Sequence, residues 1–186
     1  MKGFKNNSAD VNRFRYKGVL ILASALLNAG MVIFGRGSFI HVVAVFAIGI
    51  YIGLPSLGLT IFGYLINYLF HWGKPVARIA AVMFVFTASL FISLIPGRAV
   101  TKHDIAAAKM YCESLIPGIN RYHQKHGVYP LEIETVVQDM DVPRLLRNTH
   151  FYWSDGQKYS FTIGDPRGMM DFIGYHSYTR QWNEFH

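Results

Sequence analysis

The most informative absence in this sequence is that of acidic residues from its first half. Between Gly18 and Ile95 there is no Asp or Glu, and the only fixed charges are Arg36, Lys74 and Arg78. Proton relays and cation pathways through a membrane usually depend on carboxylates buried among the spans. The missing carboxylates therefore argue against a transporter or pump, and the long apolar runs predict membrane-spanning helices.

Cysteine is almost absent as well. The single Cys112 excludes an intramolecular disulfide, so cysteine pairing says nothing about the compartment. Cys112 falls on the apolar stripe of a predicted helix, a position typical of a buried, inert thiol and not of a nucleophile. No glycine-rich phosphate loop and no nucleophile elbow around a serine occurs. We therefore expect a protein that is not an enzyme and holds no cofactor.

The net charge of +7 is concentrated in the first half of the chain. Residues 1–95 hold eight basic side chains and one acidic one, whereas residues 96–186 hold ten of each. Basic residues beside apolar spans follow the positive-inside rule, and they do not form the basic face of a nucleic-acid-binding domain. We therefore expect no nucleic acid partner, and a cytoplasmic N-terminus over residues 1–17.

Apolar runs predict a transmembrane domain over residues 18–95. Gly18–Gly35 and Val76–Ile95 each have about the length that a bilayer core requires, and the latter run is followed by a predicted helix stop at Pro96-Gly97. Phe39–Phe70 is too long for one straight span and contains the stretch GLPSLG. A tight hairpin there gives four spans and a cytoplasmic C-terminus. A single span with a kinked or interfacial segment gives three spans and an exported C-terminus.

Three polar side chains stand out in this apolar half. Asn28 lies near the middle of the first span and must find a hydrogen-bonding partner in lipid, so we expect it to face another helix. His41 and His71 would lie near one membrane face in the hairpin arrangement, where a histidine pair can ligate haem or a pigment. The simpler interpretation is that both histidines bond to headgroups or to neighbouring helices.

The second half, residues 96–186, predicts a small soluble α+β domain. Apolar residues recur at spacings of three and four over Thr101–His126 and indicate a helix, with Pro117 expected to kink or divide it. Leu131–Gln138 is a short second helix or turn. Strands are expected over Thr149–Trp153 and Lys158–Ile163, joined by a hairpin at Asp155-Gly156, with one or two more over Phe172–Tyr178 and Arg180–Phe185.

The end of the predicted helix carries a recognisable pattern. It reads Ile119-x-x-Tyr122-x-x-x-x-Gly127-x-Tyr129-Pro130, followed by Leu131 and Ile133. This pattern resembles the soluble domain of type II secretion pseudopilins, which implies a long helix packed on a small antiparallel sheet over residues 101–186. The chain departs from that family in having several spans and no prepilin peptidase motif. Asp165-Pro166-Arg167-Gly168 resembles a loop of that family, but here it follows the predicted strand that contains Tyr159 instead of preceding it. We therefore do not infer the family's calcium site for this chain. The resemblance implies a pilin-like domain on a membrane anchor.

Two groups of residues in the soluble half are candidate sites. His123 and His126 share one face of the predicted helix end, which allows a zinc pair, but no third ligand has metal-site spacing and a solvated helix end is the simpler interpretation. The predicted strands also carry many aromatic residues, among them Trp153, Tyr175 and Trp182. These can bind a protein or a glycan, or they can form the core of a small sheet.

These observations favour a non-catalytic accessory subunit of a bacterial inner-membrane complex. Its spans would pack on a larger membrane protein in the lipid bilayer, with Asn28 as a contact, and its soluble domain, expected in the periplasm, would cap that partner. The first alternative is a stand-alone binding or immunity-type protein that captures a peptide or glycan through its aromatic C-terminal face. The second alternative is a haem- or metal-dependent membrane enzyme.

Overall fold

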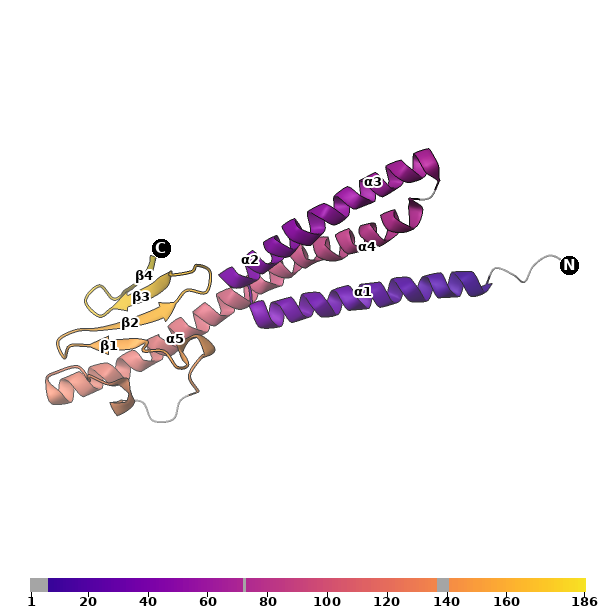
Figure 1. Cartoon of the computed structure of the whole chain (residues 1–186). Helices are drawn as coiled ribbons and strands as arrows, with labels where there is room; N and C mark the ends of the chain where they lie inside the picture. The colour runs from indigo at the N-terminus through magenta and orange to yellow at the C-terminus, as the bar shows by residue number, and fades with distance from the viewer. Residues whose placement is uncertain (1–6, 72, 137–140) are drawn as a thin grey trace. The chain divides into compact units, whose positions relative to one another are not determined.

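The computed structural model describes residues 7–71, 73–136 and 141–186, and it forms two compact units, Met1–Gly97 and Arg98–His186 (Figure 1). The boundary between the units follows Gly97, close to the change in composition. Part of the basic N-terminal segment, residues 1–6, and the end of the predicted turn at Gln138 lie outside the described residues.

The first unit is entirely helical in its described part. Its elements are α1 (Asn7–Gly35), α2 (Phe39–Ile48), the π-helical turn η1 (Gly49–Gly53), α3 (Leu54–Phe70), α4 (Lys74–Leu90) and the 3-10 turn η2 (Phe91–Ser93). Three helical runs are long and apolar enough to cross a membrane; they begin at Gly18, Phe39 and Lys74. The prediction of a transmembrane helical domain is therefore confirmed.

The middle run does not form a tight hairpin. Residues Phe39–Phe70 make one continuous candidate span of 32 residues, which agrees with the three-span interpretation and not with the four-span one. Pro55 lies in the first turn of α3 and has no N–H to donate, so the preceding turn cannot keep regular α-helical bonding. The wider π-helical turn η1 accommodates this defect, and the Ser56 hydroxyl donates to the Gly53 carbonyl at 2.8 Å.

Small residues set the contact between α3 and α4. A Cβ at Gly63 would lie 3.0 Å from the Cβ of Ala77, and a Cβ at Gly73 would lie 2.3 Å from the Gly63 carbonyl oxygen. Both glycines thus allow the two backbones to approach closely, as is common between membrane helices. Ala77 and Ala80 are buried in this contact.

The helix stop predicted at Pro96-Gly97 is wrong. Helix α4 passes through η2 directly into α5 (Leu94–His126), and the helical run from Lys74 to His126 has no break. The 3-10 turn restarts the α-helix at Leu94, which places Pro96 in the first turn of α5. Proline is tolerated there because the first-turn N–H groups have no acceptor within the helix. Pro117 does not divide α5 either.

The second unit packs α5 against a four-stranded antiparallel sheet. The strands are β1 (Tyr152–Ser154), β2 (Tyr159–Gly164), β3 (Phe172–His176) and β4 (Gln181–Phe185), in the order β1-β2-β3-β4. The predicted helix followed by a β-meander is confirmed. Its core joins the α5 stripe to the inner face of the sheet, and consists largely of Ile105, Ala108, Cys112, Leu115, Ile119, Tyr159, Phe161, Ile163, Ile173 and Tyr175.

The connection between α5 and the sheet contains only single turns in its described part. Ile133–Thr135 and Arg144–Leu146 are 3-10 turns, designated η3 and η4. Helix α5 ends at His126 and is followed by Gly127, whose φ of 76° belongs to the left-handed region that favours glycine. The amide of Gly127 donates to the His123 carbonyl at 2.8 Å and closes the last turn.

Candidate functional site

The two histidines at the end of α5 are each paired with a tyrosine ring. The His123 ring stacks on Tyr129 with centroids 4.2 Å apart, and the His126 ring lies against Tyr122 at 4.3 Å. The described residues contain no group of three His, Cys, Asp or Glu side chains that could hold a metal ion. The contacts thus give both histidines a packing role beside the corner after α5.

The corner itself packs on the sheet. Pro130 is fully buried, and its carbonyl accepts a hydrogen bond from the Tyr152 hydroxyl at 2.7 Å. The amide of Tyr129 donates to the Gly156 carbonyl at 2.8 Å, and its ring meets Tyr159 edge to face. The Gly-x-Tyr-Pro pattern therefore marks a packed corner between helix and hairpin.

His41 and His71 lie far apart along the second span. His41 is in the first turn of α2 and His71 is the C-cap of α3, so about 30 residues of helix, or about 45 Å, separate them. The shared ligand that a tight hairpin would have allowed is excluded, because the hairpin does not form. His71 is exposed, has a left-handed φ of 63°, and its Nδ1 lies 3.1 Å from the Asn67 carbonyl oxygen.

His41 is a buried packing group whose two ring nitrogens are both used. The Gly37 amide donates to Nδ1 at 3.0 Å, so Nε2 carries the hydrogen and donates to the Ser93 hydroxyl at 2.9 Å. Two glycines make room for the ring. A Cβ at Gly35 would lie 2.6 Å from the His41 Cβ, and one at Gly97 would lie 3.1 Å from Cε1. This arrangement ties the turn after α1 to η2 and leaves no nitrogen for a cofactor.

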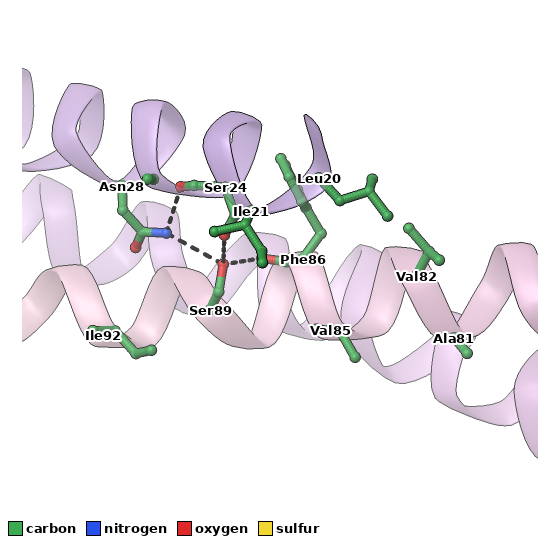
Figure 2. A pocket seen from close by; sticks show the side chains of 11 residues that line it. Leu20, Ile21, Ser24, Asn28, Ala81, Val82, Val85, Phe86, Ser89 and Ile92 are labelled. Carbon is green, nitrogen blue, oxygen red and sulfur yellow. Dashed lines mark hydrogen bonds between the residues drawn. The ribbon is translucent and has the colours of Figure 1, made fainter. Parts of the chain in front are cut away.

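Asn28 is the centre of a polar cluster between α1 and α4. Figure 2 shows Ser24 and Asn28 on α1 turned toward Ser89 on α4. The hydroxyls of Ser24 and Ser89 are 2.7 Å apart, and the Asn28 amide donates to the Ser24 carbonyl at 2.8 Å and to the Ser89 hydroxyl at 3.2 Å. The prediction that Asn28 faces another helix is confirmed. We name Ser24, Asn28 and Ser89 the polar seam.

Every hydrogen of the polar seam is already donated within the chain. The Ser89 hydroxyl donates to the Phe86 carbonyl at 2.7 Å, so the Ser24 hydroxyl must donate to Ser89. The carbonyl of Ser24 can only accept, which fixes the Asn28 amide with its nitrogen toward Ser24. The opposite atom, Asn28 Oδ1, is buried and is the one buried side-chain polar atom of the described residues that lacks a hydrogen-bond partner.

A groove runs along the polar seam between α1 and α4. Its volume is about 590 Å³, and it is open on one side. Its walls are almost entirely apolar, and the polar seam is its hydrogen-bonding part (Figure 2). The lining residues are Leu20, Ile21, Ser24, Ala25, Asn28, Ala81, Val82, Val85, Phe86, Ser89 and Ile92. Of the polar seam, the sequence singled out only Asn28 as a contact residue. Ser24 and Ser89 could not be predicted, because a serine in an apolar run does not show which helix it faces.

The three aromatic candidates of the sheet lie on different faces. Tyr175 is on the inner face and only 7% exposed, so it belongs to the core. Trp182 is also on the inner face, where its indole N–H donates to Glu113 at 2.8 Å and its ring lies 5.4 Å from the ammonium of Lys109. Trp153 is 54% exposed on the opposite face. Of the three, Trp153 alone has a mostly exposed ring.

The loop between β2 and β3 is closed by an ion pair between the buried carboxylate of Asp165 and the half-exposed guanidinium of Arg167, which the sequence did not reveal. The Arg167 guanidinium donates through Nε to both carboxylate oxygens of Asp165, at 2.9 and 2.8 Å, and also pairs with Glu184 on β4 at 3.0 Å. Burial opposes ionisation of Asp165, but the hydrogen bonds from Arg167 outweigh it and lower the pKa of this carboxyl below its usual value. The guanidinium thus supplies the positive charge beside Asp165.

No family model, curated protein or solved structure matches this chain.

Proposed function

We propose that this protein is a non-catalytic accessory subunit of a bacterial inner-membrane complex, with its spans packed on a larger membrane protein. The observation that carries the proposal is the groove of about 590 Å³ beside the polar seam. Within lipid, apolar surface is not a signal of association, because lipid tails solvate it as well as another helix would. Small and polar side chains are the features that mark helix contacts there.

The first span is the one most open to such a partner. None of its apolar window is buried within the chain, compared with 17% of the window in the second span. The polar seam holds α1 to α4 but leaves Asn28 Oδ1 without a donor. An O–H or N–H group of a partner helix that reached this oxygen from the groove would supply the missing donor. An unpaired polar group in lipid costs free energy, so such a bond would favour association.

Orientation completes the proposal. The basic residues before the first span favour a cytoplasmic N-terminus, and three spans would then leave the Arg98–His186 unit on the periplasmic side. There, the pilin-like resemblance of the Gly-x-Tyr-Pro corner supports a role as a cap on the partner. That resemblance is an analogy of fold and assigns no activity.

The test is purification of the tagged full-length chain from native membranes in mild detergent, followed by mass spectrometry of the proteins that co-elute. We expect one larger membrane protein in stoichiometric amount. Asn28→Leu should reduce its yield, whereas Thr60→Val should not, because the Thr60 hydroxyl bonds to the Ser56 carbonyl of its own helix at 2.7 Å. Recovery of the chain alone and monomeric contradicts the proposal and favours the alternative of a stand-alone binding protein.

A further inference from the structure

The outer face of the sheet, which points away from α5, has a composition unlike that of an ordinary solvated face. Strand register shows which residues share it: Trp153, Ser160, Thr162, Gly164, Phe172, Gly174, His176, Gln181, Asn183 and Phe185. We call this set the outer face. No Asp, Glu, Lys or Arg is among them, although the second half of the chain is rich in charge elsewhere.

Aromatic rings form a continuous stripe on the outer face. Phe172 and Phe185 stack with centroids 4.7 Å apart, and Phe185 also meets the ring of His176 edge to face. His176 in turn lies against Tyr178, which is 73% exposed in the turn before β4. The missing side chain of Gly174 lets the Phe185 ring lie close over the backbone, since a Cβ there would be 3.1 Å from that ring. The Phe185 ring of the stripe therefore lies close to the sheet.

The surroundings of the stripe are apolar and exposed as well. Met169 and Met170, just before β3, are 79% and 86% exposed, and Trp153 stands on the other side of Ser160 and Thr162. Water solvates such rings and thioethers poorly, so leaving them exposed forgoes favourable burial. Enrichment in aromatic residues and methionine with depletion of charge is the composition of a protein–protein interface core.

We propose that the outer face is the surface on which the soluble part of the larger partner docks, an inference that rests on the proposed function. The partner surface is uncharged at its centre, because a charge placed there would lose its water without meeting a counter-ion. It also carries neutral donors and acceptors that match Gln181 and Asn183, since a purely apolar surface would leave their amides unpaired.

The size of the outer face explains why a membrane anchor accompanies it. Four strands spaced about 4.8 Å apart and about five residues long cover roughly 320 Å². A stable interface between free proteins buries about 800 Å² on each side. The outer face is too small to hold a partner alone, but contact between the spans would convert its docking into an intramolecular step with a high effective concentration.

The experiment compares variants of the tagged full-length chain for partner yield after purification from native membranes. Thr162→Lys places a charge at the centre of the outer face, and Trp153→Ala removes an exposed ring. Gln124→Lys and Leu131→Ala are the matched controls, because both residues are exposed and lie outside the sheet. Circular dichroism confirms that each variant is folded. We expect the first two to reduce partner yield about tenfold, as loss of a good contact would, and the controls to leave it unchanged.

The outcomes separate the two proposals. Unchanged partner yield in Thr162→Lys and Trp153→Ala overturns docking on the outer face, while the accessory-subunit proposal stands. Absence of any partner from the unsubstituted chain overturns both. Recovery of two differently tagged copies of this chain, with no other protein, overturns docking of a larger partner in favour of self-association. Retention of a neutral oligosaccharide in place of a protein overturns docking of a larger partner in favour of glycan capture.

Discussion

The candidate contact residues of the two units have opposite chemistry: they are polar in the helical unit and aromatic in the unit with the sheet. In the unit with the three candidate spans, exposed apolar side chains suit a lipid surrounding, and the hydroxyls and amide of the polar seam are the exceptional groups. In the Arg98–His186 unit polar side chains are ordinary at the surface, and the exposed rings of the outer face are the exceptional groups. The same residue type therefore has a different meaning in each unit, because the surrounding solvent sets the free energy of exposing it.

The largest expected effect comes from disrupting the core of the Arg98–His186 unit. Phe161 is fully buried where α5 meets the sheet, and its ring contacts Tyr159 and Tyr175. Phe161→Ala should lower the free energy of unfolding by about 3–5 kcal/mol, because it removes apolar contacts and leaves a cavity. Thermal unfolding followed by near-ultraviolet circular dichroism measures this. A change below about 1 kcal/mol would contradict the packing described.

A smaller effect concerns the ion pair of the β2–β3 loop. The folded pKa of Asp165 is lowered, so the pair stabilises the fold at pH values above the ordinary pKa of aspartate. That stability is lost as the pH falls through the folded pKa. Asp165→Asn should cost about 1–3 kcal/mol at neutral pH, because Arg167 loses its charged acceptor.

The ion pair is tested by the dependence of the free energy of unfolding on pH below neutrality, the acid limb of the stability profile. The unsubstituted chain should lose stability with falling pH more steeply than Asp165→Asn, when unfolding is measured from neutral pH to the acidic range. Asp141→Asn is a suitable control, because Asp141 is 95% exposed in its pair with Arg147 and such pairs contribute little. Identical acid limbs for Asp165→Asn and the unsubstituted chain would show that Asp165 is not held ionised by Arg167.

The polar seam should contribute less. Hydrogen bonds between membrane helices are worth about 0.6 kcal/mol on average, so Ser89→Ala should destabilise the α1–α4 contact by about 1 kcal/mol or less. Cysteines introduced for Ile21 and Val85 would report the contact as the rate of disulfide crosslinking. We expect slower crosslinking in Ser89→Ala and unchanged crosslinking with Thr60→Val. Faster or equal crosslinking in Ser89→Ala would mean that the polar seam does not hold the two helices.

The smallest effect sharpens the comparison between the two faces of the sheet. Trp153→Ala should change the free energy of unfolding by about 0.5 kcal/mol or less, because the ring is mostly exposed. The same substitution should reduce partner yield strongly if the outer face is a docking surface. A large loss of stability in Trp153→Ala would instead assign this ring to the folding of the unit.

Much of the architecture was predictable from the sequence, because it depends on local patterns. Missing acids and long apolar runs between Gly18 and Ile95 predicted the transmembrane domain, and period-two alternation near Tyr159 predicted the strands. The continuity of helix through Pro55 and through Pro96 was not predictable in this way. Each proline lies in the first turn of an α-helix, and a π-helical or 3-10 turn just before it decides whether the chain continues or breaks.

The sequence by itself determined that long apolar helices suited to a membrane precede a small α+β unit, that Asn28 needs a hydrogen-bonding partner, and that the chain after Gly127 turns into a sheet. The tertiary structure alone decided which groups meet. It paired Asn28 with Ser89 and bonded the two ring nitrogens of His41 to Gly37 and Ser93. It also placed Trp182 on the inner face of the sheet and Trp153 on the outer face. The reason is physical: local spacing fixes which face of an element a residue occupies, but the element packed against that face comes from distant parts of the chain.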